Sequence, residues 1–319
     1  MARFLVVWCV FSVKNTVARL GEVRWPLAGT ARSLLRLVLR YGHMPTLLAI
    51  THGLCRLRLL GWGYRDRSAV ATQNFRCLTG QPGRIDAAWI AMRRQMLELG
   101  ATWGQNPACL RQVQACISEL EQVVAPLHQQ NIPVVLAPLH AVSDIIAAMV
   151  GSAVTPGRAS VVVSSSVEQA ELFNQHAREL GGVELSYCSI HQDNKQLAGE
   201  LMSLISDVAD GRQNMIIFPD ITPDYTIQTD EAHSGKIACR LFGRTAKLHS
   251  GVARLSRVVA AQVVFYHLSY QNGLTIKIHP PVTARQVAAT MPAIIENTLR
   301  DYPGDWLLWH SHSLYFINH

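Results

Sequence analysis

The sequence predicts an α/β protein with a mixed, largely parallel sheet flanked by helices. Three observations predict this fold. Between residues 130 and 260, short apolar runs rich in β-branched residues alternate with helical patterns, as in βαβ units. The chain has 319 residues and is 49% hydrophobic, which is enough to bury a large core. Asn272-Gly273 separates two further apolar runs and is typical of a hairpin turn.

The individual elements follow from apolar periodicity and from turn residues. We expect helices over residues 69–75, 85–99, 110–127, 140–150, 167–180, 194–209, 247–259 and 283–301. We expect strands over residues 132–137, 159–164, 185–190, 214–218, 261–270 and 274–279. Asp86 is suited to cap the second helix, and Gly181-Gly182 to end the fifth.

The charge is concentrated at the N-terminus. Residues 1–70 hold eleven basic and two acidic residues, a net charge of +9, whereas the rest of the chain holds 18 basic and 20 acidic residues. The arginines alternate with Leu, Val and Trp, which argues against a nucleic-acid partner and favours an anionic lipid surface. The apolar run at residues 4–13 is shorter than the roughly 20 residues that span a bilayer.

We therefore expect residues 1–64 to form amphipathic helices that associate with a membrane, and residues 65–319 to form one α/β domain. The alternative is that the basic helices simply pack on that domain. The seven cysteines show no metal-ligand spacing and predict reduced, mostly buried thiols in a part of the protein that faces the cytosol. The histidines also lack ligand spacing, so we expect no metal site.

His140 and Asp144 are the first candidates for chemistry. An apolar run ends at His140, and a carboxylate follows four residues later. If a helix begins near His140, the two side chains share one face, and Asp144 can orient the imidazole. Such a histidine can remove a proton from an attacking hydroxyl. The simpler interpretation is a helix cap beside a surface residue.

Asp220 is a second candidate. It follows Pro219 at the end of the strand expected over residues 214–218, just as His140 follows the strand expected over residues 132–137. Ligands bind beyond the carboxyl ends of strands in such sheets, so we expect both residues at one rim. Asp220 as a plain turn residue is the alternative.

Several motifs, in this order, resemble one family. They lie at residues 69–104, 140–144, 215–220, 239–246, 274–281 and 302–310, the last reading Tyr-Pro-Gly-Asp-Trp-Leu-Leu-Trp-His. Together they resemble the bacterial lipid A late acyltransferases (lauroyl/myristoyl transferases) of the lysophospholipid acyltransferase superfamily. The resemblance covers roughly residues 65–312.

The resemblance implies acyl transfer from an acyl carrier protein or coenzyme A thioester to a hydroxyl or amine of a lipid A-like or other membrane lipid. His140 would be the general base and Asp144 its orienting carboxylate, without any cofactor. Asp220 would line the acceptor pocket, and Arg244 or Lys247 would stabilise the oxyanion. The implied location is the cytoplasmic face of the inner membrane.

Two departures from the family pattern keep another reading open. Three residues separate His140 from Asp144, where the family has four, and residues 161–166 lack the arginine of the family's Tyr-Arg pair. The alternative is a non-catalytic accessory or scaffold protein at the membrane. A peripheral lipid-binding protein without chemistry is a third possibility.

Overall fold

The fold is a seven-stranded, mostly parallel sheet between layers of helices. The computed structural model describes residues 33–163, 184–190, 196–221 and 235–311. The strands of the sheet lie in the order β3-β2-β4-β1-β7-β8, with β9 beside β7. Every pairing among β1, β2, β3, β4 and β7 is parallel, whereas β8 and β9 pair with β7 antiparallel. The predicted fold class is confirmed.

The strands of the sheet are β1 (Val134–Pro138), β2 (Arg158–Val163), β3 (Glu184–Ser189), β4 (Asn214–Ile216), β7 (Gln262–Tyr270), β8 (Leu274–Ile278) and β9 (Val282–Thr283). A separate hairpin consists of β5 (Lys236–Leu241) and β6 (Arg244–His249). The helices are α2 (Met44–Arg56), η1 (Trp62–Tyr64), α3 (Arg65–Thr79), α4 (Ala87–Ala101), α5 (Pro107–Gln129), α6 (Asp144–Ala153), α8 (Leu197–Ala209), α9 (Gly251–Val258) and α10 (Val287–Asp301).

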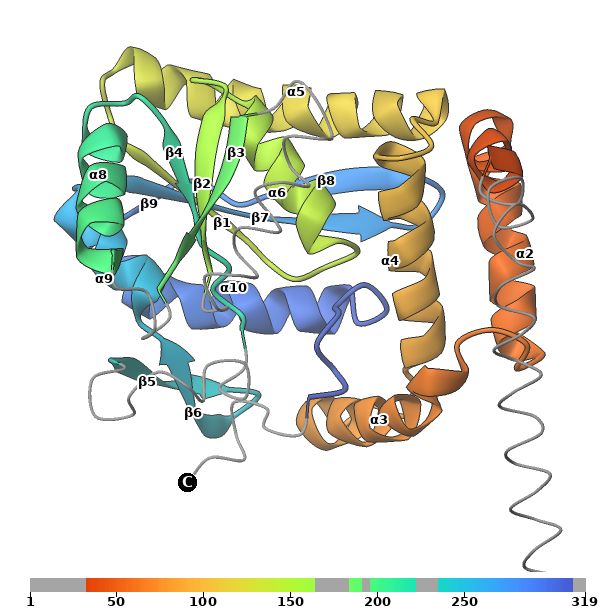
Figure 1. Ribbon diagram of the computed structural model, residues 1–319. Coiled ribbons are helices and arrows are strands. Elements are labelled where there is room, and N and C mark those ends of the chain that lie inside the picture. The colour runs from red at the N-terminus through yellow and green to blue at the C-terminus, as the bar shows by residue number, and fades with distance from the viewer. Residues whose placement is uncertain (1–32, 164–183, 191–195, 222–234, 312–319) are drawn as a thin grey trace, which may run out of the picture.

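Helices cover both faces of the sheet (Figure 1). α5 and α6 pack on one face, and α8, α9 and α10 on the other. Strand β1 shows why: Val134 and Leu136 join the core on the first face, while Val135 and Ala137 join the core on the second. All four side chains are fully buried, as expected for a central strand of a parallel sheet.

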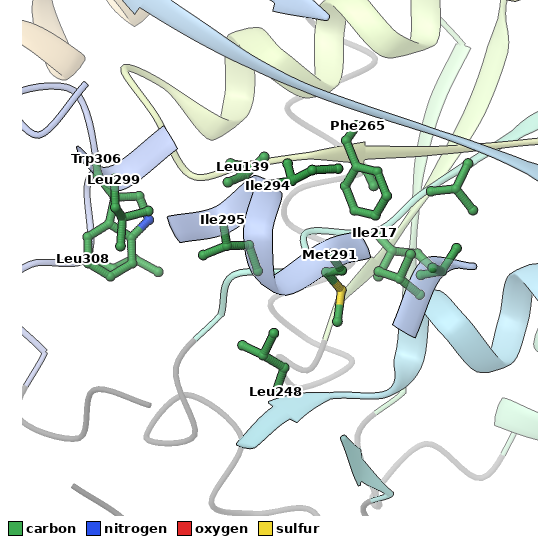
Figure 2. Close-up of a cluster of buried hydrophobic side chains, with 14 of the residues drawn as sticks. Leu139, Ile217, Leu248, Phe265, Met291, Ile294, Ile295, Leu299, Trp306 and Leu308 are labelled. Atoms are coloured by element: carbon green, nitrogen blue, oxygen red, sulfur yellow. The ribbon is translucent and has the colours of Figure 1, made fainter. Parts of the chain in front are cut away.

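The core on the α10 face reaches the rim of the sheet. Figure 2 shows Leu139 and Phe265 packed with Met291 and Ile295 of α10, and Trp306 in the same cluster. Trp306 is 1% exposed. The core therefore fixes the segment after α10 against the carboxyl ends of the strands.

Local signals set the helix starts. The Asp86 side chain accepts a hydrogen bond from the Trp89 N–H at 3.0 Å, which confirms the predicted cap. Asn106 caps α5 in the same way, with Pro107 in the first turn. Ser143 caps α6 by accepting from the Ile146 N–H at 3.0 Å.

Four expected helices begin four residues from their expected starts: those expected from residues 69 and 283 begin at Arg65 and Val287, and the other two have a local cause. The helix expected from His140 begins at Asp144, because Val142 has a φ of +62° and Ser143 is extended. The helix expected over residues 247–259 is wrong in its first part, where β6 lies instead. β5 and β6 are joined by Phe242 and Gly243, both with positive φ, the geometry that matches the twist of a tight hairpin.

Other predicted elements lie outside the described residues. These are the helix expected over residues 167–180 and the apolar run at residues 4–13. The six expected strands appear within a few residues of their expected positions, whereas β5, β6 and β9 were not expected.

The described N-terminal part is helical over residues 33–41 and in α2, which packs on α4 at the edge of the molecule (Figure 1). Exposed large apolar side chains gather here: ten of the fourteen in the described chain lie between residues 34 and 62. No helix in the described ranges has the length and apolar character needed to cross a bilayer. Membrane association of residues 1–64 stays a prediction.

Candidate active site

The sheet brings His140 and Asp220 together. β1 and β4 are parallel neighbours, with Val135 opposite Met215 and Leu136 opposite Ile216. Their carboxyl ends meet at one rim, so the residues that follow each strand are adjacent. The expectation that His140 and Asp220 share a rim is confirmed.

The Asp220 carboxylate holds His140 by two hydrogen bonds. His140 Nδ1 lies 2.8 Å from Asp220 Oδ1, and the His140 backbone N–H donates to Oδ2 at 2.9 Å. The Trp306 indole N–H also donates to Oδ2, at 2.7 Å. Asp220 is 0% exposed, and three donors replace the water that this buried carboxylate lost.

This arrangement fixes the tautomer of the imidazole. An ionised carboxylate only accepts hydrogen bonds, so Nδ1 of His140 carries the proton and Nε2 keeps a lone pair. The His140 side chain is 14% exposed, whereas its partner is not exposed at all. Among the described residues, no side chain or backbone group bonds to Nε2.

The surroundings of His140 act on its pKa in opposite directions. Burial lowers the pKa of the imidazole, because it disfavours the cation. The charge of Asp220, the hydrogen bond to it and the charge of Asp144 all favour the cation, while Arg94 opposes it. The attractions prevail, so the pKa of His140 lies above its ordinary value. The Phe218 ring packs against the imidazole with centroids 4.4 Å apart.

The backbone around His140 is bonded on both sides. The Leu139 N–H donates to the Tyr266 carbonyl of β7 at 2.9 Å. On the other side, the His140 carbonyl accepts from the Leu307 N–H at 2.9 Å, and Ala141 forms an antiparallel bridge with Trp306. These bonds hold the backbone of His140 in one position. A fixed orientation of the catalytic group favours a reaction, and a flexible surface loop would not provide it.

The segment after α10 is itself anchored. Asp305 forms a buried ion pair with Arg93 of α4 at 2.8 Å, and its carbonyl accepts from the Val142 N–H at 2.8 Å. The Asn74 side-chain amide of α3 donates to the Trp309 and Ser311 carbonyls, both at 2.9 Å. Helices α3 and α4 thus secure the segment that holds Asp220 and His140.

Asp144 has a different partner from the expected one. Its Oδ1 lies 2.6 Å from the Arg94 guanidinium, and its side chain is 29% exposed. Arg94 also pairs with Glu98 at 2.7 Å, and Glu98 accepts from the Ser143 hydroxyl at 2.7 Å. The expectation that Asp144 orients His140 by a helical i to i+4 contact is wrong, because His140 precedes the helix. The carboxylate bonded to the imidazole is Asp220, and Asp144 acts on it through space.

Arg244 and Lys247 lie on β6 of the β5–β6 hairpin, where a helix was expected to begin at Lys247. Arg244 donates to the Cys77 carbonyl at the end of α3 at 3.0 Å, and Lys247 is exposed opposite Ala238. A role of either residue in stabilising an oxyanion stays a prediction.

A cavity of about 370 Å³ adjoins the site between α4 and the segment after α10. Ile85, Ile90, Leu307 and Leu308 give it apolar walls. Its lining also includes Arg94, Glu98 and Trp306, the residues that bond to Asp144, Ser143 and Asp220. This size lies in the range of small-molecule pockets.

Sequence reasoning missed the roles of Trp306, Arg94 and Glu98. Trp306 was visible as part of the C-terminal motif, but nothing in that motif says which carboxylate its indole meets. Arg94 and Glu98 stand four apart on a helix, a spacing that predicts their mutual ion pair but not the contact with Asp144.

Comparison with known proteins gives no assignment: no protein-family model matches the chain, and a search of curated proteins returns no match. We therefore base a function on the geometry of the rim together with the resemblance of the sequence motifs.

Proposed function

We propose that this protein is a membrane-associated acyltransferase in which His140 is the general base. The observation that carries the proposal is the His140–Asp220 pair: a partly exposed imidazole whose Nδ1 is bonded to a buried carboxylate at the carboxyl rim of the sheet. Such a pair is suited to take a proton from a hydroxyl. The order of motifs in the sequence supports acyl transfer as the reaction.

The reaction needs no covalent enzyme intermediate. Nε2 of His140 removes the proton of the acceptor hydroxyl as its oxygen attacks the carbonyl carbon of a thioester. The tetrahedral intermediate then collapses, the carbon–sulfur bond breaks, and the imidazolium returns the proton to the leaving thiolate. Asp220 stabilises the imidazolium between these steps, since its charge and hydrogen bond favour the protonated ring.

The cavity beside the site supports an acyl donor. Its apolar walls, Ile85, Ile90, Leu307 and Leu308, suit a fatty acyl chain. Three of its other lining residues, Arg94, Glu98 and Trp306, bond to Asp144, Ser143 and Asp220. The donor is a thioester of acyl carrier protein or coenzyme A, and the acceptor is a lipid A-like or other membrane lipid. The exposed apolar side chains between residues 34 and 62 support contact with a membrane. The resemblance of the motifs implies the cytoplasmic face of the inner membrane.

A second candidate is a non-catalytic membrane scaffold with the same fold. One observation favours it: the carboxylate after His140 is paired with Arg94 at 2.6 Å instead of with the imidazole. The bond from Asp220 to His140 opposes it, because a scaffold gains nothing from an oriented and partly exposed base.

An acyl-transfer assay distinguishes the acyltransferase from the scaffold. It follows a labelled acyl group from acyl carrier protein or coenzyme A to a total membrane lipid extract. We expect label in a lipid with the wild type and none with His140→Ala. The matched control is His128→Ala, because His128 bonds Asn214 at 2.9 Å near the opposite end of β4. Equal label from wild type and His140→Ala would remove His140 from the mechanism. No transfer by wild type from either donor would favour the scaffold.

A further inference from the structure

Two adjoining cavities on the α2–α3 side of the molecule are lined by arginines. Their volumes are about 660 Å³ and about 530 Å³, and they share Arg65, Ser68 and Arg84. The arginines that line one or both are Arg56, Arg58, Arg65, Arg76 and Arg84. Asp86 is the one acidic side chain in these linings, and it is used to cap α4. The lining is therefore strongly cationic.

These five guanidinium groups are not neutralised within the described part of the chain, where none of them forms an ion pair. Arg65 stacks on the Trp62 ring at 4.2 Å, and Arg76 donates to the Gly83 carbonyl at 2.7 Å. Like charges that converge on one recess repel one another, and a bound anion relieves that repulsion. Guanidinium forks match phosphate oxygens in geometry as well as in charge.

The loop beside the recess presents apolar side chains to solvent. Leu57 is 71% exposed, Leu59 64% and Trp62 68%. They lie between the end of α2 and the start of α3, where Arg58 and Arg65 also lie. An apolar tip next to basic side chains is the pattern of a segment that enters the interface of an anionic membrane, and Trp is enriched at that depth.

We propose that the arginine recess binds the phosphate headgroup of an anionic membrane phospholipid while the loop at residues 57–62 inserts beside it. The recess supplies charge and phosphate geometry, and the loop supplies apolar contact with the acyl region. A soluble phosphate would use the arginines but would leave Leu57 and Leu59 in water. This inference rests on the proposed membrane association and is independent of catalysis at His140.

The test is sedimentation of the full chain with vesicles of phosphatidylcholine alone and of phosphatidylcholine mixed with phosphatidylglycerol. The variant is Arg58→Gln/Arg84→Gln, because these two guanidinium groups make no bond in the described structure and are exposed. We expect about thirtyfold weaker binding to the anionic vesicles, since each basic residue at an anionic leaflet contributes about a factor of five.

The matched control is Arg257→Gln/Arg285→Gln, which removes the same net charge from exposed positions on α9 and just before α10. We expect it to bind like the wild type. Equal loss in both double variants would show attraction by net charge alone and would overturn the recess as a site.

The loop is tested separately with Leu57→Ser/Leu59→Ser against Met202→Ser/Val258→Ser, four positions that are all 63% to 71% exposed. Only the first pair should lose vesicle binding. Quenching of tryptophan fluorescence by lipids brominated in their acyl chains should also fall in Trp62→Phe. Unchanged quenching in that variant would overturn insertion of the loop.

Two further results would contradict the lipid as occupant. One is calorimetric binding of inorganic phosphate at the recess with vesicle binding unaffected by Arg58→Gln/Arg84→Gln. The other is loss of acyl carrier protein binding in that variant with vesicle binding intact. Acyl transfer to detergent-dispersed lipid should be unchanged in it, so failure of this inference and failure of the proposed reaction are told apart.

Discussion

Two carboxylates lie near His140, and their surroundings differ sharply. Asp220 is fully buried at the end of β4 and accepts three hydrogen bonds, from the imidazole, the His140 backbone and the Trp306 indole. Asp144 is 29% exposed in the first turn of α6 and is paired with Arg94. Closeness in sequence to a histidine therefore does not select the carboxylate that bonds to it. The donors around a carboxylate and its burial do.

Asp220→Asn should have the largest effect on activity. An amide cannot stabilise the imidazolium, and its NH₂ group favours the wrong tautomer of His140. We expect the rate of acyl transfer to fall about a thousandfold, as is typical when a catalytic histidine loses the carboxylate that orients it. The rate constant for transfer with saturating acceptor measures this. A fall of less than tenfold would mean that Asp220 does not serve the base.

Trp306→Phe should test how much the hydrogen bond to the buried Asp220 carboxylate contributes to stability. The substitution removes one donor from a buried carboxylate while keeping most of the aromatic volume, so we expect a loss of about 2 kcal/mol in unfolding free energy. Urea denaturation measures it. Trp309→Phe is the control, since its indole donates to the neutral Pro303 carbonyl at 2.8 Å and should cost about 1 kcal/mol. Equal losses would show that the charge of Asp220 adds nothing.

The pH dependence of activity should show the effect of both carboxylates on the pKa of His140. Because the pKa of His140 lies above its usual 6.5, activity should rise as pH increases through that raised value, where the base becomes neutral. In Asp144→Asn the midpoint should move to lower pH, since one attraction is lost and Arg94 is no longer neutralised. A pH–rate profile of both proteins measures the shift, and an unmoved midpoint would remove Asp144 from the electrostatics of the site.

The raised pKa of His140 also makes the stability of the fold depend on pH. A folded-state pKa above the unfolded one makes the contribution of His140 fully present below pH 6.5 and lost as the pH rises through the folded value. The difference in urea midpoint between wild type and His140→Gln should therefore shrink toward alkaline pH. A constant difference would indicate that His140 keeps its ordinary pKa.

Asp144→Asn should have the smallest effect on the rate itself. Asp144 does not contact the imidazole, so we expect the alkaline plateau of activity to stay within about tenfold of the wild type. Arg94→Met is the companion variant and should give a loss of the same order. If Asp144→Asn matched Asp220→Asn in severity, the two carboxylates would be equivalent and the structural distinction between them would carry no functional weight.

Most of the elements, and the rim of the sheet, can be predicted from the sequence. Strands β1, β2, β7 and β8 follow from runs of β-branched residues, and the Asp86 cap follows from local chemistry. His140 and Asp220 could be placed at one rim because parallel strands end on the same side. These inferences depend on short-range patterns, which neighbouring residues in the sequence determine.

The sequence does not show which carboxylate bonds to His140, because that contact depends on the tertiary fold. A hydrogen bond requires about 2.8 Å between atoms, and His140 and Asp220, 80 positions apart in the sequence, carry no local signal of that distance. The positive φ of Val142 places His140 outside the helix, so the expected i to i+4 contact never forms. The Trp306 contact depends likewise on α10 packing against the sheet, because long-range packing sets such distances and sequence spacing does not.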